Sequence, residues 1–184
     1  MIMNKKWDSK EEMYFSWYLD ELVDAGYARN YDLHPREFIL TNKQTVQVEK
    51  HLKTKVKIIE KTFLQPHVYT PDFYIRWLHN ADDIFLSKIK GSGVFWAATP
   101  VLIDSFIEIK PTFSRYNMAR VFSLNQKWMY DKYGIYVQLT KPCELFKKTF
   151  TPIRYLTTDI SGKPRKINYK VFSLEEYINQ KESL

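Results

Sequence analysis

The alternation of apolar and polar positions marks one stretch of the chain above the others. In residues 105–110, Ser-Phe-Ile-Glu-Ile-Lys, the apolar Ile107 and Ile109 alternate with the charged Glu108 and Lys110. Side chains alternate between the two faces of a strand, so this pattern predicts an acid and a base side by side, roughly 6 to 7 Å apart. Charges inside so apolar a stretch are costly to bury unless they are paired or bind a metal, and the pair is therefore a site candidate.

Three further segments are predicted to be extended. Residues 31–40 form an edge segment with Pro35 in its middle, and residues 68–77 form a strand that begins at or just after Pro71. Residues 41–61 are polar and rich in lysine, and their alternating Val and Ile positions predict strands or a hairpin with a basic face. That face is either simply solvated, which is the ordinary case, or contacts phosphates.

Two longer segments show the pattern of helices. Residues 10–25 follow the good N-cap Ser9, with Glu12 placed as in a capping box and Gly26 as the stop. Glu12 has two candidate roles, helix capping and metal binding. Residues 115–133 form a second helix that ends at Gly134, and a short strand over 135–139 completes a strand, helix, strand unit. A last short helix is predicted after Ser173.

Length and composition predict one domain with its own hydrophobic core. The 184 residues are 45% hydrophobic, which suffices to bury a sizeable core without disulfides or metals. We expect a core over residues 9–140, an inserted hairpin within 78–104, and a C-terminal extension over 141–184 that packs on the core. The segment 78–104 is long for a connection, and the strand pairing would differ if it held a core strand.

Charge and cysteine content limit the partners and the compartment. The formal net charge of +7 favours a polyanionic partner, because lysine and arginine release the counterions that surround phosphates. No apolar run is long enough to span a bilayer, so no membrane partner is expected. The single Cys143 and the lack of a basic-then-apolar leader in the first thirty residues predict a cytoplasmic protein.

The motifs, taken in order, resemble those of a known nuclease superfamily. A helix with Glu12 after Ser9 is followed by the segment Pro35-Arg-Glu-Phe38, a Pro71-Asp72 strand, and the Glu108-Ile-Lys110 strand. This arrangement resembles the PD-(D/E)xK nucleases, more narrowly the phage endonucleases related to endonuclease I that resolve Holliday junctions, and the transposon end-cleaving endonucleases. The resemblance covers roughly residues 9–139.

The resemblance implies an α/β fold with a restriction-endonuclease-like core, in which helices flank a mixed central sheet. It implies a Mg²⁺-dependent or Mn²⁺-dependent endonuclease with DNA as the partner. If the protein is phage-encoded, its location is the cytoplasm of the host cell, and if the substrate is a four-way junction, we expect a symmetric homodimer. The implied metal ligands are Asp72, Glu108, the carbonyl oxygen of Ile109, and Glu12 if it reaches the site. Lys110 would orient or deprotonate the attacking water or stabilise the transition state, and Lys127 would face the scissile phosphate.

Other interpretations of these residues stay open at this point. Glu108 and Lys110 are alternatively an exposed strand pair of small energetic value, and Asp72 an ordinary turn aspartate. The four histidines, His34, His51, His67 and His79, lack metal-ligand spacing and are expected to be structural or surface residues. A non-catalytic module that binds DNA or a virion partner is the competing function, and an RNA-directed nuclease is a third.

Overall fold

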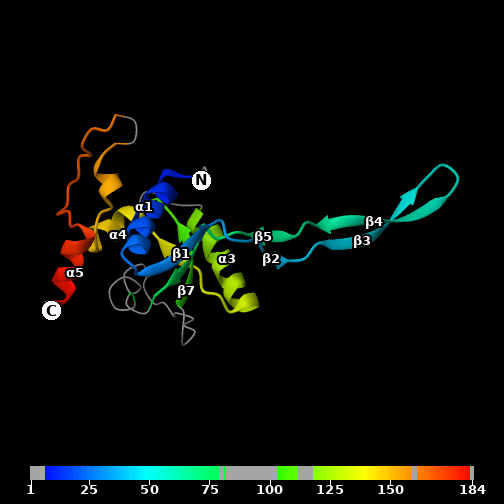
Figure 1. Cartoon of the computed structure of the whole chain (residues 1–184). Helices are drawn as coiled ribbons and strands as arrows, with labels where there is room; N and C mark the ends of the chain where they lie inside the picture. The colour runs from blue at the N-terminus through cyan, green and yellow to red at the C-terminus, as the bar shows by residue number, and fades with distance from the viewer. Residues whose placement is uncertain (1–6, 79–80, 82–102, 112–117, 159–160, 183–184) are drawn as a thin grey trace, which may run out of the picture.

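The computed structural model has a mixed four-stranded sheet at its centre (Figure 1). The structure describes residues 7–78, 81, 103–111, 118–158 and 161–182. The strands lie in the order β1 (Ala28–Leu33), β6 (Phe73–Trp77), β7 (Ile103–Ile109) and β8 (Gln138–Thr140). Strand β6 is antiparallel to both β1 and β7, and β8 is parallel to β7. With helices beside the sheet, the chain belongs to the mixed α/β class, as expected.

Helix α1 (Lys10–Asp24) covers one face of this sheet. The Ser9 side chain caps its first turn, and the backbone N–H of Tyr27 donates to Leu22 O at its end. Gly26 adopts a φ of 76° there, which residues with a Cβ rarely adopt. The α1 residue Phe15 is fully buried and meets Phe73 of β6 edge to face. The predicted helix is thereby confirmed to within one residue at its end.

Helix α3 (Met118–Tyr133) lies on the opposite face and links the parallel strands β7 and β8. Its buried Phe122 and Met129 share a cluster with Phe106, whereas the neighbouring Ile107 belongs to the cluster under α1. This division follows the alternation of side chains along β7. The predicted strand, helix, strand unit is therefore present, with the helix starting at Met118 in the described residues.

A long two-stranded arm extends from the body of the protein (Figure 1). Its base pairs β2 (Phe38–Thr41) with β5 (His67–Tyr69), and its outer part pairs β3 (Gln44–His51) with β4 (Val56–Leu64). The lysine-rich segment is thus a hairpin. The strand predicted to begin at or just after Pro71 is β6, which starts at Phe73. The extended segment 31–40 divides between the end of β1 and the start of β2, so it belongs partly to the central sheet and partly to the arm.

The hairpin expected within 78–104 falls largely on residues 82–102, which lie outside the described part of the chain. At its far end, Ile103 and Asp104 already belong to β7 and pair with Trp77 and Arg76. The segment therefore returns to the sheet two residues earlier than predicted.

The C-terminal part packs on the free side of α1. It comprises α4 (Pro142–Lys148), the 3₁₀ turn η3 (Ile153–Leu156) and α5 (Leu174–Glu182). Phe146 and Phe150 stack on Tyr18 of α1, whose hydroxyl donates to Thr149 Oγ1 at 3.2 Å. These residues share one hydrophobic cluster with the central sheet. Within the described residues, no helix combines the length and apolarity needed to cross a lipid bilayer.

Candidate active site and metal centre

Glu108 and Lys110 form an ion pair at the end of β7. Lys110 Nζ donates to Glu108 Oε1 at 2.5 Å, and the two side chains are 12% and 9% exposed, respectively. The hydroxyl of Tyr69, from the base of the arm, donates to the other carboxylate oxygen at 2.7 Å. Both oxygens of Glu108 are thus engaged. The interpretation as an exposed surface pair is wrong, because this pair is desolvated and has a third partner.

Asp72 lies directly before β6, beside the end of β7. Its Oδ2 accepts a hydrogen bond at 2.6 Å from the backbone N–H of Ile109, the residue between Glu108 and Lys110. Strand β6 places Asp72 there because it runs antiparallel to β7, so the start of one meets the end of the other. The Pro-Asp and Glu-x-Lys motifs of the sequence therefore meet at one end of the sheet.

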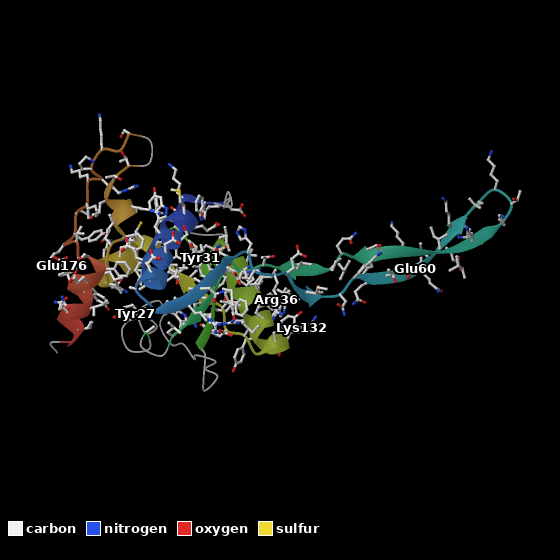
Figure 2. The ribbon with its side chains drawn as sticks, in the orientation of Figure 1. Tyr27, Tyr31, Arg36, Glu60, Lys132 and Glu176 are labelled. Carbon is white, nitrogen blue, oxygen red and sulfur yellow. The ribbon has the colours of Figure 1, made fainter. Side chains whose placement is uncertain are left out.

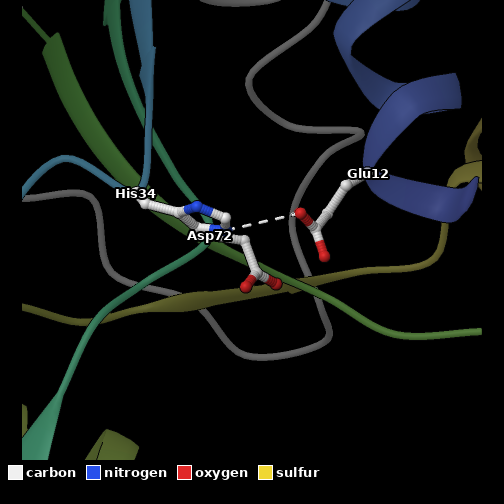
Figure 3. A group of neighbouring side chains, drawn as sticks. All are labelled: Glu12, His34 and Asp72. Atoms are coloured by element: carbon white, nitrogen blue, oxygen red, sulfur yellow. Dashed lines mark ion pairs between the residues drawn. The ribbon is translucent and has the colours of Figure 1, made fainter. Parts of the chain in front are cut away.

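Glu12 reaches this end of the sheet from the first turn of α1. Ligand atoms of Glu12, His34 and Asp72 all lie within 4.8 Å of one another (Figure 3). The carboxylate also serves the helix end, because Glu12 Oε1 accepts from Ser9 Oγ at 2.9 Å and Glu12 Oε2 from the Asp8 N–H at 3.1 Å. Glu12 thus caps the helix and also faces Asp72.

His34 joins the cluster, contrary to its predicted role as a structural or surface residue. Its Nε2 lies 3.4 Å from Glu12 Oε2, and its backbone N–H donates to Asp72 O at 2.9 Å (Figure 3). Its φ of 47° turns the chain from β1 toward the arm. No sequence spacing connects His34 with Glu12 or Asp72, because the helix-to-strand and strand-to-strand packing that brings them together is tertiary.

The electrostatics of the cluster centre on Asp72. Burial and the neighbouring Glu108 carboxylate raise the pKa of Asp72 to about 7, and Glu12 adds to this rise. The hydrogen bond from the Ile109 N–H and the positive charge of Lys110 lower the pKa and so oppose it. Burial and the same Glu108 also raise the pKa of the Tyr69 hydroxyl, which therefore stays a donor. Three carboxylates face one lysine here, so the site has an excess of negative charge that a cation would offset.

The donor set fits a hard divalent cation. The carboxylate oxygens of Glu12 and Asp72 are ligands that Mg²⁺ and Mn²⁺ accept, and the imidazole of His34 extends the choice to softer metals. Glu108 lies beside this group, with its two oxygens bonded to Lys110 and Tyr69. Ile109 enters the site through its N–H bond to Asp72, while its side chain is buried in the core on the other face. The metal-binding role of its carbonyl stays a prediction.

Lys127 does not join the other predicted site residues. It is exposed on α3, two positions from the buried Asn125 and Met129, which places it on the side of the helix opposite the packed face. Among the described residues, none of the interactions found connects Lys127 with Asp72 or Glu108. That it faces the scissile phosphate stays a prediction.

Tyr69 is a second site residue that sequence reasoning missed. It sits in the predicted strand 68–77, but nothing in the pattern shows that its hydroxyl reaches Glu108.

Comparison of the chain with protein-family models, with curated proteins and with solved structures finds no match.

Proposed function

We propose that the protein is a Mg²⁺-dependent or Mn²⁺-dependent endonuclease that hydrolyses phosphodiester bonds of DNA. The observation that carries the proposal is the hydrogen bond from Ile109 N–H to Asp72, which holds a carboxylate against the Glu108–Lys110 pair. The order α1, β1, β6, β7, α3, β8 supports it, since it agrees with a restriction-endonuclease-like core: a helix, an antiparallel meander that carries the acids, and a crossover helix to a parallel strand.

Each residue has a defined task in the proposed reaction. Asp72 and Glu108, with Glu12 beside them, hold the metal through carboxylate oxygens. The bound metal supplies charge stabilisation for the phosphate and helps generate the nucleophile at neutral pH. Lys110 positions the attacking water and stabilises the negative charge that develops on the phosphate oxygens. A bond forms between the water oxygen and phosphorus, the bond to the leaving oxygen breaks, and that oxygen takes up a proton.

Tyr69 acts through a carboxylate, because its hydroxyl fixes the orientation of Glu108. Such outer contacts orient ligands in metal sites, and their loss typically lowers metal affinity or activity about 10- to 100-fold. His34 lies against Glu12 and offers a ring nitrogen as a further ligand for softer metals.

We assign DNA as the partner because the chain carries a net charge of +7, which attracts phosphates. A branched substrate, a phage origin and a host-cell cytoplasmic location follow from the resemblance described above. A four-way junction would require two such sites, hence a symmetric dimer.

The test is a cleavage panel. Labelled duplex, single-stranded, flapped and four-way-junction DNA, with an RNA duplex beside them, are incubated with Mg²⁺, Mn²⁺ or EDTA. We expect cutting that requires metal and disappears in Lys110→Ala. The matched control is Lys147→Ala, which breaks a surface Glu–Lys pair of 2.8 Å far from the site in sequence; it should cut like the parent.

The competing function, a non-catalytic module that binds DNA or a virion partner, makes the opposite prediction. It predicts binding without cutting under every metal. The paired carboxylates argue against it, because acids facing a phosphate repel it unless a metal intervenes.

A further inference from the structure

The arm leaves the body of the protein between two residues of the site. Leu33 of β1 pairs with Phe73 of β6, and the next residue, His34, bonds through its N–H to Asp72 O. Residues 35–71 are therefore a connection whose two ends both lie at the cluster, next to His34 and Asp72. Figures 1 and 2 show it extending far from the body, with Glu60 on its outer half.

Its base is anchored firmly. Phe38, Leu40 and Tyr69 are buried in the cluster that contains the α3 residues Phe122 and Met129. Two α3 side chains hold the same carbonyl of the arm, since Lys132 Nζ and Tyr133 OH donate to Ile39 O at 2.6 and 2.8 Å. Figure 2 places Lys132 at this junction. The outer part of the arm, by contrast, has no other element packed on it among the element contacts found.

The two faces of the outer arm differ in charge. Cross-strand partners share a face, and the register gives three such pairs on one side, here called the basic face: Val46 with Lys61, Val48 with Ile59, and Lys50 with Lys57. Among the paired residues of β3 and β4 no acid lies on this face. The opposite face carries both acids of the two strands, Glu49 and Glu60, which have their own partners there: His51 and Thr45.

Lys50 and Lys57 stand directly opposite each other, an arrangement that like charges disfavour in a free protein. All three lysines of the basic face are exposed. The turn adds Lys53 and Lys55, so positive charge continues to the tip. A polyanion beside this face would neutralise charges that otherwise repel.

We propose that the basic face of the arm binds double-stranded DNA by lying in its major groove, which delivers the duplex to the cluster from which the arm emerges. This inference rests on the proposed nuclease function. A two-stranded antiparallel ribbon fits a groove about 12 Å wide. The eight residues of β3 span about 26 Å at roughly 3.3 Å per residue, most of one helical turn of the duplex.

A second copy of this chain fits the face less well. A symmetric contact through the basic face would oppose lysine to lysine, and lysines at strand edges are a common protection against edge-to-edge pairing. Val46, Val48 and Ile59 between the lysines suit apolar contacts with thymine methyl groups.

The first test measures binding without turnover. A labelled 20-base-pair duplex is titrated in EDTA at several salt concentrations with the parent, with K50Q/K57Q/K61Q, and with the charge-matched control K148Q/K163Q/K166Q. The control lysines are exposed and lie in the C-terminal part. We expect the arm variant to lose roughly 10- to 100-fold in affinity and its salt slope to fall by about 2 to 3, and the control to change little. Equal effects of the two variants would overturn the proposal.

The second test compares the two faces at adjacent positions. Cys143 is replaced by Ser, and a thiol-linked photocrosslinker is placed at Val46→Cys on the basic face or at Gln47→Cys on the other. We expect DNA adducts from position 46 only, and protection of guanine N7 atoms from dimethyl sulfate by the parent. Adducts from both positions, or adducts to a second copy of the chain, would overturn the assignment.

The two proposals fail separately. If the parent cuts no DNA with any metal but the arm variant still loses binding, the nuclease is wrong and the arm's role stands. If the parent cuts and the arm variant binds and cuts like the parent, the arm's role is wrong and the nuclease stands.

Discussion

The backbone N–H of Ile109 donates to Asp72 Oδ2 at 2.6 Å, across 37 positions of the chain. This one bond joins the two acidic motifs, because Ile109 stands between Glu108 and Lys110. It also limits how far burial raises the pKa of Asp72, since an N–H donor favours the charged carboxylate. Asp72 is nevertheless poised to titrate near neutrality, which gives the site a measurable pH dependence.

Removing the charge of Asp72 should stabilise the metal-free protein at high pH. The pKa of this carboxyl is about 7 in the folded protein against 3.8 ordinarily. Between these values the folded state binds more protons, so the free energy of unfolding falls as pH rises and is lowest above pH 7. We expect Asp72→Asn to raise stability at pH 8 by on the order of 2 kcal/mol, or about 5 °C in Tm, and to have little effect near pH 4.

Thermal melts in EDTA from pH 4 to 8 check this prediction. Asp32→Asn, at an exposed aspartate of β1, is the control and should not show the pH-dependent gain. A variant less stable than the parent at pH 8 would contradict it.

Tyr69→Phe should weaken metal binding without unfolding the protein. The variant keeps the buried ring and loses the hydroxyl that orients Glu108, so we expect about 1 kcal/mol less stability and roughly 10-fold weaker Mn²⁺ binding by calorimetry. Tyr133→Phe loses a comparable hydroxyl bond, to Ile39 O at the base of the arm. Equal metal affinities of the two variants would show that Tyr69 does not act through Glu108.

The two roles of Glu12 can be separated with a second capping box in the same chain. At α5, Glu176 Oε2 accepts from the Ser173 N–H at 2.8 Å, and Ser173 Oγ caps the helix as Ser9 does. Replacing either serine by alanine should cost about 1 kcal/mol. Only Glu12→Gln, not Glu176→Gln, should weaken Mn²⁺ binding and slow cleavage. If both glutamine variants behave alike, Glu12 is a helix cap and nothing more.

His34→Asn should alter metal preference. Asparagine tolerates the φ of 47° and removes the ring nitrogen near Glu12. Because imidazole suits Ni²⁺ and oxygen ligands suit Mg²⁺, we expect calorimetry to show Ni²⁺ affinity falling about 10-fold and Mg²⁺ affinity changing little. His51→Asn, at an exposed histidine paired with Glu49 on the arm, serves as control. A loss of both metals alike would point to a general disturbance of the cluster.

The sequence predicts those parts of the structure that local pattern determines. The cap at Ser9, the stop at Gly26, the alternation through β7 and the amphipathic α3 are all set by neighbours within a few residues. Strand β1 was not recognised as a strand of the central sheet, because its sequence Ala-Arg-Asn-Tyr-Asp-Leu is largely polar and exposed. Its apolar partner β6 lies beyond the whole arm.

The same division applies to the site. Asp72, Glu108 and Lys110 carry motifs and are brought together, whereas His34 and Tyr69 carry none. Their positions depend on where β1 ends and where the arm begins, which is a matter of tertiary packing. Lys127 differs from these residues, since only the resemblance suggests it and none of the interactions among the described residues links it to Asp72 or Glu108.

The arm also bears on how quickly the cluster can assemble. His34 and Asp72 are far apart in sequence, and closing so long a flexible loop directly would cost more entropy than closing a short one. The turn at residues 52–55, closed by the Leu52 N–H donating to Lys55 O, lets β3 and β4 pair one step at a time from the tip inward. Each step adds only a small loop, and β2 with β5 continues the series to the base. We therefore expect β1 and β6 to meet by stepwise pairing from the turn, at the microsecond rates typical of hairpins. At each step the residues that pair are already held close together by the pair formed before them.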